Sequence, residues 1–227
     1  MNVLVVSDIH SNFAALEAVL DDAGSWDAAI SAGDTVGYGP NPEECVDRLY
    51  FKGFRCVAGN HDYAVATVET DWFNDDAQVA IRINRGQLSG ASLRWLEKLP
   101  TELKFELNGF KVSVYHGSPT EPLTSYIYSE TAEARAEDYL RLTGADIIIL
   151  GHTHIPYKIE RGGRFILNPG SVGQPRDGDP RASYLIIETD PLRVEHRRIE
   201  YNIDTTAKAI DAAGLPHKFA TRLYRGT

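Results

Sequence analysis

Short aliphatic runs that alternate with helical periodicity most constrain the fold of this chain. The run Ile147–Leu150 is continuous and rich in β-branched residues, which is typical of a strand covered on both faces. Asn2–Asp8 has the same character, and Asp27–Asp34 and Phe54–Asn60 follow it as two further short strands. In the first half of the chain, a stretch with helical periodicity lies between Asn2–Asp8 and Asp27–Asp34, and another lies between Asp27–Asp34 and Phe54–Asn60. Gly24 is placed to end the first of these helices. The first half is therefore predicted to be βαβαβ.

The second half of the chain predicts antiparallel pairs instead. Three segments each contain two alternating runs joined by a turn: Leu103–Gly117, Tyr157–Asn168 and Ala182–Tyr201. The Asn108-Gly109 turn is a strong hairpin signal. A helix over Ser129–Gly144 leads into the Ile147 strand, and Asp204–Thr227 is predicted to be a helix with a polar end. We expect one α/β (α+β) domain over residues 1–227, with two packed mixed β-sheets flanked by helices.

Composition narrows the class of protein. The chain has 227 residues with 43% hydrophobic and 24% charged, which is ordinary for a globular protein. Its 32 acidic and 23 basic residues give a net charge of −9, which disfavours a nucleic-acid or anionic-membrane partner. No apolar run is long enough to span a bilayer, and "MNVLVVSDIH" lacks a secretory signal pattern. We expect a cytoplasmic protein in which Cys45 and Cys56 are reduced and structural.

The ends of five predicted strands carry side chains that can bind metal ions. In chain order these are Asp8 and His10, Asp34, Asn60 and His61, His116, and His152 and His154. In α/β sheets, ligand sites lie at the carboxyl ends of the strands. Five of the seven histidines in the chain fall at these points.

Each position alone has a simpler explanation. Asp8 or Asp34 can be a cap or turn residue, Asn60 can close a turn, and His116 can be a satisfied, partly buried histidine. His152 and His154 point the same way if the chain is extended there, but they can also be surface residues in a turn. The joint pattern is harder to explain without metal, because buried carboxylates and imidazoles would repel or remain unsatisfied. Two divalent cations would supply the missing positive charge.

The ordered series DIH, GD, GNHD, H and GHTH resembles the calcineurin-like metallophosphoesterase superfamily. The segments VGYGPNP, HGSP and NPGSVGQPRDG are similar to its small prokaryotic phosphodiesterase branch. The resemblance extends from residue 2 to about residue 190 and keeps the motifs in family order. It implies two packed mixed sheets flanked by helices, in agreement with the pattern of the elements.

The resemblance also implies a ligand set. A first metal would be held by Asp8, His10, Asp34 and His154, and a second by Asp34, Asn60, His116 and His152, with Asp34 bridging. Carboxylate and imidazole donors suit Mn²⁺, the ion we expect, as well as Fe, Co²⁺, Ni²⁺ or Zn²⁺. Two ions roughly 3.5–4 Å apart can clamp a phosphoryl oxygen and activate a hydroxide for in-line attack on phosphorus.

The family places His61 beside the metals, where it would protonate the leaving-group oxygen or stabilise its charge. The related protein serine/threonine phosphatases carry GDxxDRG, in which an aspartate orients this histidine and an arginine holds phosphate. This chain has Gly37 and Tyr38 at those two places, which leaves the group that orients His61 open and argues against a protein phosphatase.

Substrate contacts are expected from Asn12, Tyr38 and Arg176, although a helix cap is the simpler explanation of Asn12. Further phosphate anchors are conceivable at Arg161, Arg164 and Arg181, each of which can also be a solvated surface charge. We expect a dinuclear metal-dependent phosphodiesterase acting on a small phosphoester or nucleotide. The alternatives are a phosphomonoesterase, a nucleotide pyrophosphohydrolase, a nuclease, or a non-catalytic binding subunit. The sequence does not define the oligomeric state.

Overall fold

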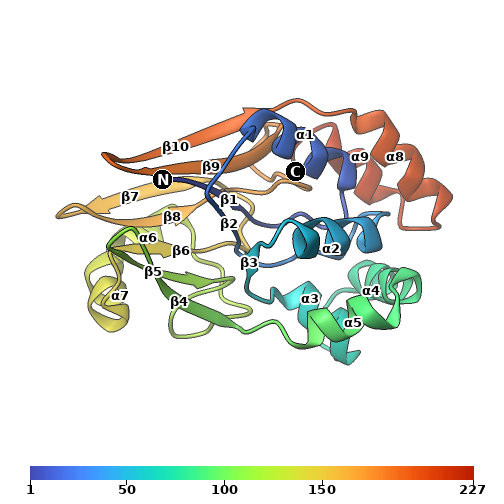
Figure 1. Cartoon of the computed structure of the whole chain (residues 1–227). Coiled ribbons are helices and arrows are strands. Elements are labelled where there is room, and N and C mark those ends of the chain that lie inside the picture. The colour runs from blue at the N-terminus through green and yellow to red at the C-terminus, as the bar shows by residue number, and fades with distance from the viewer.

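The computed structural model describes residues 1–227 and contains two five-stranded sheets (Figure 1). The first sheet has the order β10-β9-β1-β2-β3 and the second β4-β5-β6-β8-β7. The strands are β1 (Asn2–Val6), β2 (Ala28–Ser31), β3 (Arg55–Cys56), β4 (Glu102–Leu107), β5 (Phe110–Tyr115), β6 (Ile147–Ile149), β7 (Tyr157–Arg161), β8 (Arg164–Asn168), β9 (Ala182–Thr189) and β10 (Leu192–Ile199). The helices are α1 (Phe13–Ala23), α2 (Pro42–Phe51), α3 (Asn60–Thr67), α4 (Asp75–Gln87), α5 (Gly90–Glu97), α6 (Ser129–Ala134), α7 (Ala136–Thr143), α8 (Ile203–Ala212) and α9 (Lys218–Leu223).

Both sheets are mixed, as the sequence predicts. Strands β1, β2 and β3 are parallel, and β9 and β10 join them as an antiparallel pair. In the second sheet β5, β6 and β8 are parallel, and the hairpins β4–β5 and β7–β8 supply its edges. The turn of the first hairpin has positive φ at Asn108 (46°) and Gly109 (88°), which the right-handed twist of hairpin strands favours.

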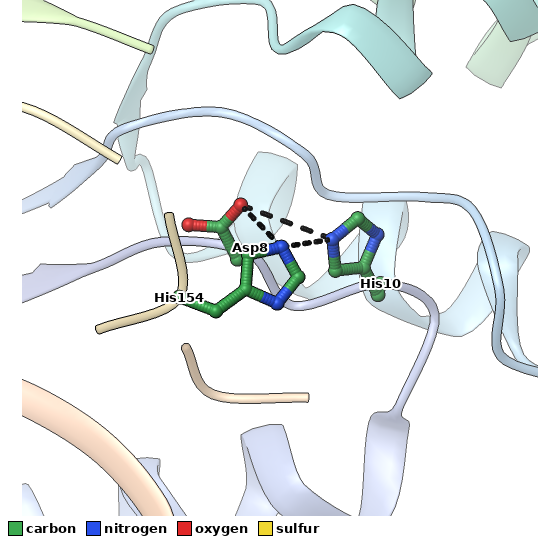
Figure 2. A group of neighbouring side chains, drawn as sticks. All are labelled: Asp8, His10 and His154. Carbon is green, nitrogen blue, oxygen red and sulfur yellow. Dashed lines mark hydrogen bonds and ion pairs between the residues drawn. The ribbon is translucent and has the colours of Figure 1, made fainter. Parts of the chain in front are cut away.

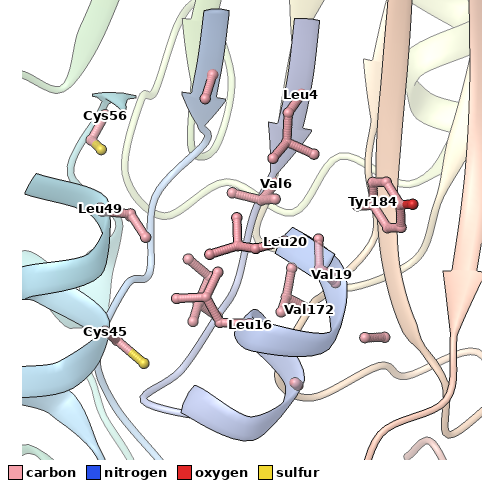
Figure 3. Packing of buried hydrophobic residues seen from close by; sticks show 14 of the residues in the cluster. Leu4, Val6, Leu16, Val19, Leu20, Cys45, Leu49, Cys56, Val172 and Tyr184 are labelled. Atoms are coloured by element: carbon pink, nitrogen blue, oxygen red, sulfur yellow. The ribbon is translucent and has the colours of Figure 1, made fainter. Parts of the chain in front are cut away.

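Alternate side chains of β1 divide the core into two layers. Val3 and Val5 enter a cluster that includes residues of both sheets and joins them face to face. Leu4 and Val6 point to the opposite face, where they pack with Leu16 of α1 (Figure 3). Because successive side chains of a strand point to opposite faces, a strand buried on both sides reads as a continuous aliphatic run. Both cysteines are free and buried in the cluster under α1.

The outer face of the second sheet is covered in the same way. Ile148 of β6 packs in a cluster with Tyr139 and Leu140 of α7. In Figure 1, α6 and α7 lie against this sheet, on the opposite side of the molecule from α1. The result is the predicted sandwich of two sheets flanked by helices. No helix in the structure has the length and hydrophobicity required to cross a membrane.

Two predicted segments differ from the structure. The single helix expected over Ser129–Gly144 is divided into α6 and α7 at Arg135, whose φ of −105° and ψ of 6° interrupt the helix. The expected polar end of the chain is a second helix, α9, because Leu215, Phe219 and Leu223 recur every four residues and are buried in a cluster with α8 and Ala80 of α4. Helices α4 and α5 are separate, because Leu88 and Ser89 between them have extended backbones, with ψ of 139° and 159°.

Candidate metal centre

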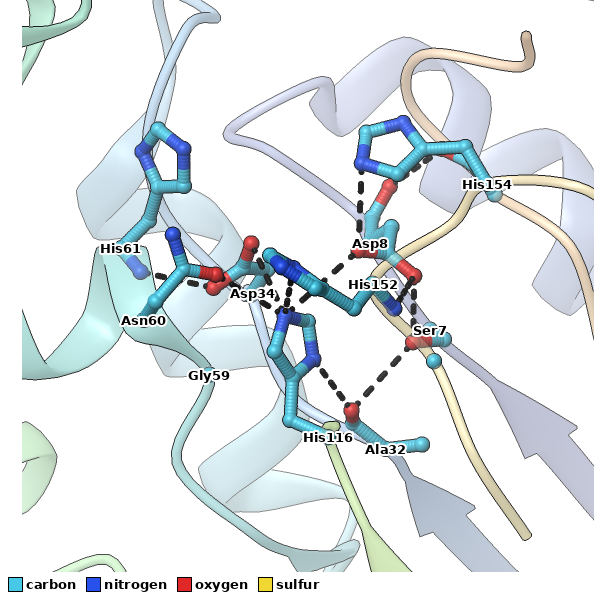
Figure 4. A network of polar contacts seen from close by, with 12 residues as sticks. Ser7, Asp8, Ala32, Asp34, Gly59, Asn60, His61, His116, His152 and His154 are labelled. Carbon is cyan, nitrogen blue, oxygen red and sulfur yellow. Dashed lines mark hydrogen bonds and ion pairs between the residues drawn. The ribbon is translucent and has the colours of Figure 1, made fainter. Parts of the chain in front are cut away.

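The structure brings all seven predicted metal ligands to one buried cluster at the carboxyl ends of the parallel strands (Figure 4). Asp8 and His10 follow β1, and Asp34 follows β2. Asn60 and His61 open α3, directly after the short strand β3. His116 follows β5 of the second sheet, and His152 and His154 follow β6. Because β1, β2 and β3 run parallel in one sheet and β5 and β6 in the other, residues distant in sequence end at one edge.

A first group consists of Asp8, His10 and His154 (Figure 2). The Nε2 atoms of His10 and His154 lie 3.1 Å apart. Asp8 Oδ1 lies 3.3 Å from Nε2 of His154 and 3.8 Å from Nε2 of His10. Three potential donor atoms therefore converge on one point.

A second group consists of Asp34, His116 and His152, with Asn60 in contact with His116 (Figure 4). Asp34 also lies close to His10 and His61, which places it between the two groups and His61 next to them. Nε2 of His116 lies 3.0 Å from Oδ1 of Asn60 and 3.0 Å from Nδ1 of His152. Asp34 Oδ2 lies 3.3 Å from Nε2 of His116 and 3.6 Å from Nε2 of His10. This single oxygen is therefore adjacent to both groups.

The outward nitrogen of each imidazole is fixed by a backbone carbonyl. The four contacts are His10 Nδ1 to Val36 O (3.1 Å), His154 Nδ1 to Gln174 O (2.6 Å), His116 Nδ1 to Ala32 O (2.8 Å) and His152 Nε2 to Thr124 O (3.1 Å). A carbonyl only accepts, so the nitrogen facing it must carry the proton. In a neutral imidazole the inward nitrogen is then a bare lone pair, which is the orientation that a metal-binding histidine requires.

The carboxylates are oriented in a corresponding way. Asp8 Oδ2 accepts hydrogen bonds from the Ser7 hydroxyl (2.6 Å) and the His152 backbone N–H (3.1 Å), while its Oδ1 is buried without a partner. Asp34 Oδ1 accepts the backbone N–H of His61 (2.8 Å), which leaves Oδ2 to face the cluster. A buried oxygen without a hydrogen-bond partner is costly unless another group, such as a cation, compensates for it.

Burial also shifts the charges of the cluster. It raises the pKa of Asp8 to about 7, and lowers the pKa of His10 and His154 well below the ordinary value. Burial also opposes the ionisation of Asp34 and His116, but their mutual attraction holds the pKa of Asp34 low and raises the pKa of His116 to about 9. Without metal, His116 is thus the one charged imidazole available to two buried carboxylates. The donor set fits divalent cations, which would supply the missing positive charge.

Several of these residues have strained backbones. φ is positive at Asp8 (53°), His10 (49°), Asp34 (53°), His152 (66°) and His154 (61°). Non-glycine residues rarely adopt this region, and such strain concentrates at functional sites. Of the two alternatives for His152 and His154, the structure has the turn rather than the extended chain, but both side chains are buried rather than on the surface. The left-handed turns direct His152 to the second group and His154 to the first.

His61 lines the cleft beside the predicted metal ligands. Its ring centroid lies 4.3 Å from that of Tyr38 and 4.8 Å from that of Phe73. Its Nδ1 is buried without a hydrogen-bond partner and faces Gly37, where a Cβ atom would approach it to 2.4 Å. Ring packing, rather than a carboxylate, therefore orients this histidine. Burial lowers the pKa of His61 to about 4, so a neutral imidazole is the form near pH 7.

Of the three residues predicted to contact the substrate, two line the cleft and one does not. Tyr38 and Arg176 line the cleft, with the Arg176 guanidinium 5.8 Å from the centre of the Tyr38 ring. Asn12 is buried and does not line it, and its Oδ1 accepts from the Ala15 backbone N–H at the start of α1. We therefore assign Asn12 to the helix cap.

The remaining candidate arginines do not line the cleft. Arg161 pairs with Glu133, and Arg181 pairs with Asp179 at 2.6 Å. Arg164 opens strand β8, at the end opposite to the cluster.

Sequence reasoning missed several residues of the cleft. Ser7, which orients Asp8, gives no signal beyond its position before that aspartate. Trp72 and Phe73 form the loop wall between α3 and α4, and Tyr126 follows β5 on the other side. Two adjacent aromatic residues in the polar stretch ETDWFNDD were a visible signal.

Comparisons with known proteins agree with this geometry. Residues 1–191 match the profile of the calcineurin-like phosphoesterase superfamily domain. The chain therefore belongs to the calcineurin-like phosphoesterase superfamily.

Three relatives illustrate the range of similarity. A metallophosphoesterase structure from Sphaerobacter thermophilus is 40% identical with a TM-score of 0.87, covering 100% of this chain and 99% of that one. The uncharacterized protein MJ0912 of Methanocaldococcus jannaschii is 34% identical over 99% of this chain and 98% of its own length. Phosphodiesterase YfcE of Escherichia coli is 27% identical over 86% of this chain and 91% of its own length.

Proposed function

We propose that this protein is a phosphodiesterase that uses two divalent metal ions. The main support is the contact between His10 and His154, whose Nε2 atoms face each other at 3.1 Å. Both rings donate through Nδ1 to backbone carbonyls, so neither Nε2 carries a proton that could join them. Two bare lone pairs at this distance repel unless a cation lies between them and Asp8.

Each residue of the centre has a role in this proposal. Asp8, His10, Asp34 and His154 hold the first ion, and Asp34, Asn60, His116 and His152 hold the second. When bound, the two ions would supply Lewis-acid stabilisation of a phosphoryl oxygen and activation of a water molecule. Mn²⁺ is the ion that we expect, because the donors are carboxylate and amide oxygens and imidazole nitrogens.

His61 and Arg176 act on the substrate. The neutral His61 ring donates a hydrogen bond to the leaving-group oxygen, where charge develops as the ester bond breaks. Arg176 binds a non-bridging phosphoryl oxygen beside Tyr38, for which a guanidinium is well suited.

α8 and α9 pack behind Tyr38, which supports the treatment of residues 1–227 as one domain.

A diester is favoured over a monoester by the charge of the cleft. Arg176 is the one arginine among the residues that line it, and no lysine joins it. A diester carries one negative charge at neutral pH and a monoester carries close to two, so the diester requires fewer cationic side chains in addition to the two metal ions. The similarity to phosphodiesterase YfcE points in the same direction.

Metal removal and replacement test this function. The chelator-treated protein should lose hydrolysis of the diester bis(p-nitrophenyl) phosphate and regain it with Mn²⁺. The Mn²⁺-loaded protein should hydrolyse the monoester p-nitrophenyl phosphate more slowly than the diester. His154→Ala should lose bound metal, whereas His217→Ala is a matched control because this side chain is 73% exposed and outside the site. Full activity in demetallated protein would exclude the metal-dependent mechanism, and faster monoester hydrolysis would reverse the substrate assignment.

A further inference from the structure

Aromatic rings on two sides of the candidate metal centre form the walls of the cleft. On one side, the Phe73 ring lies edge-on to His61 at 4.8 Å, and Trp72 lies 6.0 Å beyond Phe73. On the other side, the Tyr126 ring lies 3.9 Å from the ring of His152, with an interplanar angle of 32°. Each wall thus begins at a residue of the centre and extends outward toward solvent.

The outer rings of these walls are exposed. Trp72 is 52% exposed and Tyr126 is 50% exposed, although an aromatic side chain gains much free energy from burial. Both line a cavity of about 390 Å³ that also contains Asp34, His61 and Arg176, which is a volume typical of small-ligand sites. The metal chemistry uses neither ring, so their place in the cleft requires another explanation.

The composition of the cavity wall indicates what it binds. Four of its twelve residues are hydrophobic, and all four are aromatic: Tyr38, Trp72, Phe73 and Tyr126. An aliphatic substituent would be served equally well by the leucine, isoleucine and valine side chains that are abundant elsewhere in this chain. Aromatic faces differ from these in that they stack on planar rings, and the stacking of a nucleobase on a tryptophan or tyrosine is a well-established source of affinity.

We propose that the substrate of this centre is a phosphate ester that carries a planar aromatic ring, which binds against Trp72 and Tyr126. The proposal rests on the proposed function, since the metal centre binds the phosphoryl group while the walls bind its substituent. A nucleobase and a simple aryl group share this chemistry. With a net charge of −9 and a single arginine in the cleft, the protein is suited to a small ester rather than to a polyanion.

Binding of phosphonates, in which the bond from phosphorus to the organic group cannot be hydrolysed, tests the proposal independently of turnover. The probes for calorimetry on Mn²⁺-loaded protein are the methyl esters of methylphosphonate, cyclohexylphosphonate, phenylphosphonate and a nucleoside 5′-phosphonate, because each ester carries one negative charge, as a diester does. The phenyl and nucleoside compounds should bind at least about tenfold more tightly than the methyl and cyclohexyl compounds. Cyclohexylphosphonate is the matched control, because it is as apolar as the phenyl compound but has no aromatic face. Tighter binding of the nucleoside than of the phenyl compound would identify the ring as a nucleobase, and the reverse would identify an aryl group.

Variants of the walls locate the effect. Trp72→Ala and Tyr126→Ala should each reduce the phenyl-to-cyclohexyl affinity ratio about threefold or more, and Trp72→Phe should preserve most of it. Phe51→Ala should not change the ratio, because this ring is 77% exposed on α2, outside the cleft. Trp72 is exposed in a loop, so its replacement leaves the core intact.

Three results would overturn the proposal: equal affinity for the phenyl and cyclohexyl compounds, equal affinity for the phenyl and methyl compounds, or no binding of any phosphonate. The first would leave a plain apolar cleft and the second would leave the rings without a role. Failure of the proposed function is recognised separately, as the absence of metal-dependent diester hydrolysis.

Discussion

The backbone N–H of His61 donates a hydrogen bond of 2.8 Å to Oδ1 of Asp34. The residue proposed to act on the leaving group is thereby tied to the residue proposed to bridge both metals. Asp34 uses its other oxygen, Oδ2, toward His10 and His116. One carboxylate thus connects both groups of donor atoms to the start of α3, which carries Asn60 and His61.

This relationship makes Asp34→Asn a specific test of the bridge. The amide oxygen of asparagine can still accept the His61 N–H, but the replacement removes the negative charge shared by both metal groups. Both sites should therefore lose metal together, with affinity falling at least about 100-fold, since even indirect partners of a metal site typically contribute 10–100-fold. Asn60→Ala should mainly empty the second site. Elemental analysis measures this, and two full metal equivalents in Asp34→Asn would contradict the bridging assignment.

His61→Ala should separate catalysis from metal binding. The variant should keep its metals and its fold, while turnover falls by on the order of 10²–10⁴, the range expected when a proton donor is lost. The loss should be smaller for a nitrophenolate leaving group, which needs no proton, and larger for an alkoxide. The measurements are metal content and kcat for diesters that differ only in leaving group. Equal losses for all leaving groups would make His61 a positioning residue, and loss of metal would contradict its placement outside the ligand set.

The sequence predicted the convergence of the donors because topology determines it. Asp8, Asp34 and His116 all follow parallel strands, and the carboxyl ends of such strands meet at one edge whatever the details of the loops. The burial of β1 and β6 on both faces was likewise predictable. Their short runs of consecutive aliphatic residues place apolar side chains on both faces of the strand, which is typical of a strand covered on both sides.

The sequence could not predict which atom of each residue faces the centre. His152 presents Nδ1, whereas His116 and His154 present Nε2. That choice depends on carbonyls distant in the chain, such as Thr124 O for His152, and on the left-handed turns at the histidines themselves. The position of Trp72 depended in the same way on how an irregular loop packs, which local periodicity does not determine.

The C-terminal helix should support the site through Phe219. This side chain is 1% exposed, packs in the cluster of α8 and α9, and its ring centroid lies 4.9 Å from that of Tyr38. Phe219→Ala should lower the free energy of unfolding by about 3–5 kcal/mol, the usual cost of removing a buried phenylalanine. It should also raise KM for a diester, because Tyr38 loses the surface on which it rests.

Urea denaturation and steady-state kinetics measure the two effects. Phe219→Leu should recover most of the stability, and Phe51→Ala, on an exposed ring, should change it by no more than about 0.5 kcal/mol. Unaltered KM in Phe219→Ala would show that Tyr38 keeps its position without this contact.

Gly37 should be required for the orientation of His61. Its φ of +99° is unfavourable for any residue with a side chain, and an added Cβ would lie 2.4 Å from Nδ1 of His61. Gly37→Ala should therefore displace the imidazole from between Tyr38 and Phe73, lowering turnover toward that of His61→Ala, by on the order of 10²–10⁴. Bound metal should remain, because the three atoms nearest to the added Cβ all belong to His61 and none to a proposed metal ligand. Gly24→Ala is the matched control, since Gly24 also has positive φ (66°) but no atom within 4 Å of the added Cβ, so it carries the backbone strain without the clash. Metal content, unfolding free energy and kcat should be measured for both variants. If both lost the same fraction of kcat, or if Gly37→Ala kept wild-type turnover, the position of His61 would not depend on the space that Gly37 leaves open.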